Sequence, residues 1–176
     1  MQRIPVWDIL VRATHWIVAL IVIAELVVLH PDSAIHRLAG YTAVALVALR
    51  LVWGVIGTRY ARFSAFPPSL GAVREHLRQM KYGETELHLS HNPLGALMVY
   101  NLWATMIGLG ITGYMMTTDR YWGVAWVANL HSGLADWVII SVTLHVAGVA
   151  YDMSRSKINL VRAMITGKKE IPGPGE

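Results

Sequence analysis

Hydrophobic residues along this chain of 176 residues gather in four long runs, which polar segments separate. The runs cover residues 7–30, 34–57, 93–116 and 129–152. Each is as long as the roughly 20 helical residues that cross a hydrocarbon layer of about 30 Å. The sequence has no long alternation of apolar and polar positions, which would indicate a strand. We therefore predict an all-α protein, a transmembrane four-helix bundle that forms a single membrane domain.

The first two polar segments predict how the helices connect. Residues 31–33 leave room for a tight turn, so the first two helices are expected to be antiparallel neighbours. Residues 58–92 form a long polar loop that contains the stretch LGAVREHLRQM. This stretch places apolar side chains at helical spacing: Leu70, Val73, Leu77 and Met80. Such spacing indicates an amphipathic helix that lies on the membrane surface.

The last two polar segments differ from each other in charge. Residues 117–128, TTDRYWGVAWVA, are expected to form a short interfacial segment that Trp122 and Trp126 anchor at the membrane boundary. The tail, residues 153–176, is basic and ends in GKKEIPGPGE, so we expect it to be partly disordered.

The basic residues predict the orientation of the chain. With four spans, those near the amino end, in the loop 58–92 and in the tail all fall on one side of the membrane. They include Arg3, Arg12, Arg59, Arg62, Arg74, Arg78, Lys81, Arg155, Lys157, Arg162, Lys168 and Lys169. Arg37 and Arg120 lie near the other side. The positive-inside rule then predicts that both termini are cytoplasmic.

Composition narrows the classes of protein that fit. The chain is 55% hydrophobic and 15% charged, which is too apolar for an ordinary soluble domain. It has no cysteine, which excludes disulfides, thiolate-bound iron–sulfur clusters and thioether-attached haem. Topology and anionic lipid account for the formal net charge of +4, so no nucleic-acid partner is expected.

Four histidines lie in or at the ends of the predicted spans, and they fall at two depths. Following the helices through the membrane puts His15 and His145 near the cytoplasmic face, and His36 and His131 near the far face. His131 and His145 are fourteen positions apart. That is roughly 21 Å along a helix but only about 40° around it, so both point the same way.

Two stacked pairs of histidines suit two b-type haems, because each planar iron macrocycle needs an axial nitrogen on either side from neighbouring helices. Other interpretations stay open. Each histidine could be an ordinary interfacial residue, or a pair could belong to a transport site for zinc or iron. His30 could also replace His36 at the far level, but Pro31 and Asp32 suggest an exposed turn, so we favour His36.

Further side chains could surround the haems. Haem propionates need cationic partners, and Arg12 and Arg37 lie close in sequence to the candidate ligands at the two boundaries. Arg50 follows His36 by fourteen positions, so it should either point toward the cytoplasmic-side haem or reach its own interface. Gly40 lies one turn beyond His36 on the same face and would let a flat ring approach the helix.

Two polar residues near the helices remain to be placed. Glu25 lies near the middle of the first span, where it either moves protons or forms a hydrogen bond with another helix; we favour the hydrogen bond. Asn92 precedes Pro93 at the start of the third span, which is typical of a helix N-cap.

Several stretches of the chain form a distinctive set: VWDILVRATHW, HRLAGY, RLVWGVIGTRYARF, HNPLGA, TGYMM, LHSGLADWVIISVTLHVAGV and NLVRAMITGKK. Together they resemble the bacterial di-haem cytochrome b561 family. They are most similar to the b-type cytochrome subunits of membrane-bound nickel–iron hydrogenases. The resemblance implies a bundle in the bacterial inner membrane with two haems b, one between His15 and His145 and one between His36 and His131.

The same resemblance implies a quinone site. In related subunits an asparagine at the start of this helix helps to bind a quinone beside the cytoplasmic haem. By that resemblance His91 and Asn92 become quinone-site candidates.

The function that follows is electron transfer across the membrane, between a periplasmic redox partner such as a hydrogenase-like subunit and the quinone pool. Whether the chain is also an enzyme with quinone reductase activity stays open. One alternative is a free-standing cytochrome b561-type oxidoreductase that uses superoxide and quinone. Another is a metal-ion transporter that uses the intramembrane histidines and carries no chromophore. The sequence leaves a homodimer open and names no donor, quinone type or direction.

Overall fold

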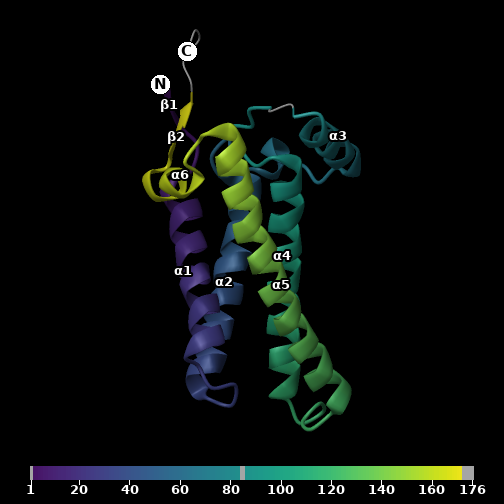
Figure 1. The fold of residues 1–176 in the computed structure, drawn as a ribbon. Coiled ribbons are helices and arrows are strands. Elements are labelled where there is room, and N and C mark those ends of the chain that lie inside the picture. Colours follow the sequence, from purple (N-terminus) through teal and green to yellow (C-terminus); the bar gives the residue numbers. More distant parts are fainter. Residues whose placement is uncertain (1, 84–85, 172–176) are drawn as a thin grey trace.

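The computed structural model describes residues 2–83 and 86–171. Four long helices run side by side (Figure 1): α1 (Ile9–Val27), α2 (Ala34–Ile56), α4 (Pro93–Met116) and α5 (Ala125–Ser156). All four are long and apolar enough to cross a membrane. The prediction of an all-α transmembrane four-helix bundle is therefore confirmed.

Shorter elements gather at one end of the bundle. A turn of 3-10 helix (Phe63–Ala65) and α3 (Leu70–Lys81) lie between α2 and α4, where the spacing of apolar residues predicted a helix. After α5 come α6 (Leu160–Thr166) and the strand β2 (Lys168–Ile171). Figure 1 places α3, α6 and β2 at the same end, which we call the termini end. The turns at residues 28–33 and 117–124 mark the opposite end, which we call the hairpin end.

Polar N-cap side chains lie at the start of three of the long helices. The side-chain oxygens of Asp8, Ser33 and Asn92 accept hydrogen bonds from backbone N–H groups in the first turns of α1, α2 and α4. Such caps satisfy donors that a helix start leaves without a partner. They explain why the helices begin where they do, and Asn92 has the N-cap position that its sequence context indicated.

The expectation for the segment before the last span was partly wrong. Residues 117–124 form turns, but α5 already begins at Ala125 and continues to Ser156. At 1.5 Å per residue this helix is about 48 Å long, more than a bilayer core requires. Trp126 therefore belongs to the first turn of α5.

The expectation of a chain without strands was wrong, and the described part of the tail, residues 153–171, forms the end of α5, α6 and β2. β2 pairs antiparallel with β1 (Gln2–Pro5), and Gly167 accepts backbone hydrogen bonds from Val6 and Trp7 at 2.8 and 3.0 Å. Strands of four residues are too short to carry a readable alternation, and packing against the rest of the chain forms them. Residues 172–176 of the predicted tail lie outside the described residues.

Gly167 is required at the junction of α6 and β2. Its φ is +82°, a left-handed conformation that glycine adopts without strain. A Cβ atom built on it would lie 2.5 Å from the backbone oxygen of Trp7. The close approach of the tail to the amino end therefore depends on the missing side chain.

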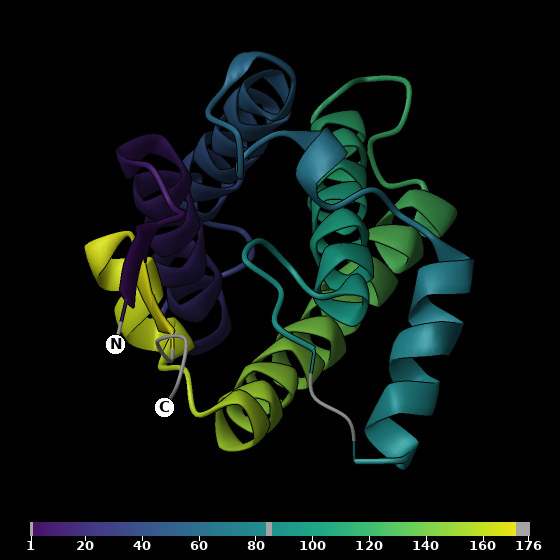
Figure 2. The same cartoon turned by 90° about the horizontal axis from the view of Figure 1, so that it is seen from above.

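Helix packing leaves two long helices apart. α1 packs along α2, α2 along α4 and α4 along α5, whereas α1 and α5 do not pack along each other within the described residues. Figure 2 shows this arrangement from above. The faces of α1 and α5 that look into the bundle are thus separated.

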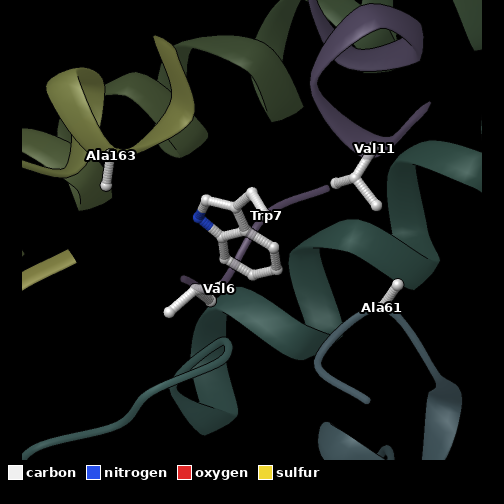
Figure 3. Packing of buried hydrophobic residues seen from close by; sticks show 5 residues of the cluster. All are labelled: Val6, Trp7, Val11, Ala61 and Ala163. Carbon is white, nitrogen blue, oxygen red and sulfur yellow. The ribbon is translucent and has the colours of Figure 1, made fainter. Parts of the chain in front are cut away.

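Two apolar clusters hold the bundle together. One closes the termini end around Trp7 (Figure 3) and consists of Val6, Trp7, Val11, Ala61 and Ala163. The other lies midway along the long helices and consists of Ala43, Val47, Met106 and Val138. Many large apolar side chains on the outside are exposed, among them Leu20, Val27, Ile140 and Leu144. This outer surface is the one that lipid contacts in a membrane-embedded protein.

Candidate functional site

Near the hairpin end, one histidine pair joins α2 and α5. The ring centroids of His36 and His131 are 6.3 Å apart, and the ring planes are inclined at 81°. His30, the alternative at this level, is exposed in the turn after α1. Of the two candidates, the structure brings His36 to His131.

Both rings of this pair are oriented by their Nδ1 atoms. Glu25 Oε2 lies 2.6 Å from Nδ1 of His36, and Thr112 Oγ1 lies 2.9 Å from Nδ1 of His131. The Thr112 hydroxyl donates its proton to the Gly108 carbonyl at 2.8 Å, so it accepts from the histidine. With Nδ1 as donor in each ring, the lone pair of Nε2 is available to a ligand.

Nearer the termini end, a second histidine pair joins α1 and α5. The ring centroids of His15 and His145 are 6.4 Å apart, at an interplanar angle of 56°. The Nδ1 atom of His15 is buried and has no hydrogen-bond partner. This pair bridges the two long helices that do not pack along each other.

The separation of the rings in both pairs fits a shared metal. Imidazole nitrogens bind a metal such as zinc at about 2.0–2.1 Å, and the ring centroid lies about 1 Å behind the nitrogen, which puts two rings on one metal about 6 Å apart. Within the described residues, no group of three or more His, Asp or Glu side chains could hold a bare metal ion. Two facing imidazoles without further ligands suit iron in a macrocycle, whose own nitrogens supply the remaining positions.

The apolar cluster of Ala43, Val47, Met106 and Val138 lies between the two histidine pairs in the direction of the helix axes. On α2, Ala43 and Val47 come after His36, and on α5, Val138 stands midway between His131 and His145. The two sites are therefore separated by packed side chains that are mostly apolar, with buried Ser141 accepting from Asn101 Nδ2 at 2.8 Å at the same level.

Arg50 is the predicted partner that lies deepest in the protein. Its side chain is only 5% exposed, Nη2 donates to the Ala61 carbonyl at 2.8 Å, and the guanidinium lies 5.2 Å from the Trp103 ring centroid. Nη1 is buried without a partner. A buried cationic donor that lacks an acceptor fits a group such as a propionate at this level.

The other predicted haem neighbours are less enclosed. Arg12 Nη1 donates to the Ile165 carbonyl of α6, whereas its buried Nε has no partner. Arg37 is exposed, and its Nη1 donates to the Asp32 carbonyl at 3.4 Å. A Cβ atom added to Gly40 would meet nothing within 4 Å, so α2 has open space beside it there.

The two quinone candidates lie at the termini end. Asn92 accepts from Gly95 N at 2.7 Å, and its Nδ2 donates to Asp152 at 3.2 Å. The centroid of the His91 ring lies 4.9 Å from that of the Trp7 ring and 4.7 Å from that of the Phe66 ring. The Nδ1 atom of His91 is buried without a hydrogen-bond partner.

His91 also borders an open pocket of about 430 Å³. Its lining is rich in polar side chains: Arg59, Tyr60, Ser64, His88, Ser90 and His91. Burial lowers the pKa of His91 to about 3, and the charges of Lys169 and Arg50 act in the same direction. The imidazole is therefore neutral at physiological pH.

Sequence reasoning missed two residues that shape this end. Asp8 accepts from Val11 N, Trp53 Nε1 and Thr58 Oγ1, and its place before an apolar run was a cap signal that could have revealed it. Lys169 is 5% exposed and donates to the carbonyls of His88 and Ser90. No local pattern marks that lysine, because its partners lie about eighty residues away.

Comparison with known proteins agrees with this arrangement. A comparison with curated proteins found no significant match, but the model of a family described as prokaryotic cytochrome b561 matches residues 6–167. That range covers all four spans and every histidine of the two pairs. The chain therefore belongs to the prokaryotic cytochrome b561 family, whose members are b-type cytochromes that transfer electrons in the membrane.

Proposed function

We propose that this chain holds two haems b and carries electrons across the bacterial inner membrane, between a periplasmic redox partner and the quinone pool. The observation that carries the proposal is the pairing of His15 with His145 and of His36 with His131, with ring centroids 6.4 and 6.3 Å apart. The spacing of the two ligands on α5 puts these sites roughly 21 Å apart along the helix, which divides the bilayer into shorter steps.

The residues of the chain hold, space and insulate the two centres. When bound, each haem supplies a one-electron Fe(III)/Fe(II) couple. The four imidazoles would hold the irons, and the apolar side chains around Val47 and Val138 pack between the two sites. Arg50 supplies a buried cation for a propionate at the level nearer the termini end, and the open space beside Gly40 admits a flat ring near the hairpin end.

The termini end is proposed to face the cytoplasm. This end carries β1, β2, α3 and α6, and with them most of the basic residues, so the positive-inside rule supports the assignment. The His15–His145 site then lies near the cytoplasmic face and the His36–His131 site near the periplasmic face. A hydrogenase-like subunit that docks at the hairpin end would deliver electrons to the second of these sites.

The polar pocket beside His91 is the proposed site for a quinone head group. A quinone carbonyl needs a hydrogen-bond donor, and the neutral ring of His91, which lines the pocket, can provide one. Asn92 follows in the chain outside this lining, and its amide donates to Asp152. The pocket opens to the surface, which gives protons a route to water. We expect His91→Phe to keep both haems and to slow their reduction by a quinol analogue, whereas unchanged quinol kinetics would remove this site.

Haem stoichiometry tests the function directly. A pyridine haemochrome assay on the purified protein should give two haems per chain. His36→Ala and His131→Ala should each lower the number to one, and His30→Ala, the control for an exposed histidine in the same region, should leave it at two. A colourless wild-type protein, or two haems retained in His36→Ala, would contradict the proposal.

A further inference from the structure

We propose that Glu25 is a positioning residue that acts through His36 and makes the midpoint potential of the hairpin-end haem the lower of the two. This inference rests on the proposed function, because it requires iron on His36. It adds a direction to that function, which the sequence does not encode.

The contact between Glu25 and His36 is close and exclusive. The two residues belong to neighbouring helices, and their atoms Oε2 and Nδ1 are 2.6 Å apart. The second carboxylate oxygen, Oε1, is buried without a hydrogen-bond partner, so among the described residues the carboxylate forms a hydrogen bond with His36 alone, although its charge also acts on the nearby His131. The hydrogen bond from His36 N to Ser33 Oγ holds the backbone of the same histidine at the start of α2.

A carboxylate on the outer nitrogen of an axial histidine changes the metal site. When Nδ1–H donates to a carboxylate, Nε2 becomes a stronger electron donor to the metal. The charge of Glu25 also interacts more strongly with iron in an apolar bundle than it would in water. Both effects stabilise the ferric form over the ferrous form and lower the reduction potential.

The other three candidate ligands lack such a partner. His131 donates to the hydroxyl of Thr112, which is neutral and is itself engaged with the Gly108 carbonyl. Nδ1 of His15 has no partner, and within the described residues no hydrogen bond joins His145 to a carboxylate. The carboxylate partner is thus specific to the site near the hairpin end.

A buried cation strengthens the difference at the other site. Arg50 lies fourteen residues after His36 on α2, an offset that by helical rise reaches the level of the His15–His145 pair, and its side chain is buried with the Asp8 carboxylate within electrostatic reach. A positive charge there favours the ferrous form. At the hairpin end Arg37, which follows His36 in the sequence, is exposed and screened by water. The two ends therefore bias the potentials in opposite directions, which favours electron flow from the hairpin end to the termini end.

Redox titration of the purified two-haem protein tests this inference. The wild type should show two midpoint potentials, and Glu25→Gln, which keeps the shape of the side chain and removes its charge, should raise the lower one and leave the upper one in place. A tenfold change in the relative stability of the two oxidation states would appear as about 59 mV. Glu75→Gln, a control at an exposed glutamate on α3, should shift neither potential.

A second variant keeps the inference testable if Glu25→Gln loses a haem. His36→Ala should retain the haem at the termini end, so the single remaining potential should be the upper one of the wild type. If the remaining potential is the lower one, or if Glu25→Gln holds two haems with both potentials unmoved, the inference is wrong and the proposed function stands. A wild-type protein with fewer than two haems would instead overturn the proposed function.

Discussion

Single side chains at the termini end connect segments that are far apart in the sequence. Asp8 caps α1 and also accepts hydrogen bonds from Trp53 and Thr58, so it ties α1 to the end of α2. Burial raises the pKa of Asp8, but the hydrogen bonds from Thr58, Trp53 and Val11 outweigh burial and hold the pKa below its usual value. Asp8 is therefore in its carboxylate form in the folded protein.

In contrast to Asp8, His91 lies in surroundings that favour its uncharged form. Burial between Trp7 and Phe66 and the nearby charges of Lys169 and Arg50 lower its pKa to about 3. An unfolded histidine has a pKa of about 6.5, so the unfolded chain binds one more proton than the folded chain between those values. Stability should therefore fall as the pH drops below about 6.5.

The pH dependence of stability gives the first prediction. Between pH 7 and pH 5, the burial of neutral His91 should lower the free energy of unfolding by about 2 kcal/mol. Thermal unfolding in detergent should therefore show a smaller loss of stability over this range in His91→Phe than in the wild type. His30→Gln, a control at an exposed histidine, should keep the wild-type slope. Equal slopes in the wild type and His91→Phe would show that His91 is not buried in its neutral form.

At the scale of elements, the tail is fastened to the rest of the protein by three kinds of contact. β2 pairs with β1, Gly167 accepts from the backbone of residues 6 and 7, and Lys169 reaches two carbonyls before α4. Burial lowers the pKa of Lys169 to about 8. A lysine of this kind is costly to bury, and its contacts with the carbonyls of His88 and Ser90 offset the cost.

Removal of the Lys169 amine gives the second prediction. Lys169→Met should leave the carbonyls of His88 and Ser90 without a donor, at a cost of about 1–3 kcal/mol for each buried group. Hydrogen exchange should then become faster in β1 and β2 while the long helices keep their protection. Lys168→Met is the matched control, since Lys168 is exposed. Unchanged exchange in β2 would mean that strand pairing alone holds the tail.

At the scale of the whole molecule, the distribution of charge and apolar surface governs how the bundle sits in a membrane. The exposed apolar side chains cover the outer faces of the long helices, and the basic residues gather at the termini end. The hairpin end carries few charges, among them Arg37 and Arg120. This asymmetry predicts one orientation, with the termini end in the cytoplasm.

Accessibility of single cysteines gives the third prediction, and the chain suits it because it has none of its own. In spheroplasts, Asp119→Cys at the hairpin end should react with a membrane-impermeant maleimide. Lys81→Cys at the end of α3 should react only after the membrane is permeabilised. Both positions are exposed in the structure, so burial does not explain a difference between them. The reverse pattern of labelling would invert the orientation.

The sequence by itself determined the features that depend on residues close to one another along the chain. Four apolar runs predicted the spans, the spacing around Leu77 predicted α3, and Asn92 before Pro93 indicated the start of α4. The depth of each histidine also followed, because depth depends on position along a helix. Hydropathy, helical periodicity and capping act within a few turns and can therefore be read locally.

The tertiary structure decided the contacts between segments that are distant in sequence. These include the bond of Glu25 to His36, the reach of Lys169 across the termini end, the pairing of β1 with β2, and the facing of His131 by His36 rather than His30. Each depends on how the helices rotate and pack against one another. That choice is made by the fit of whole helix faces, which no short stretch of the sequence contains.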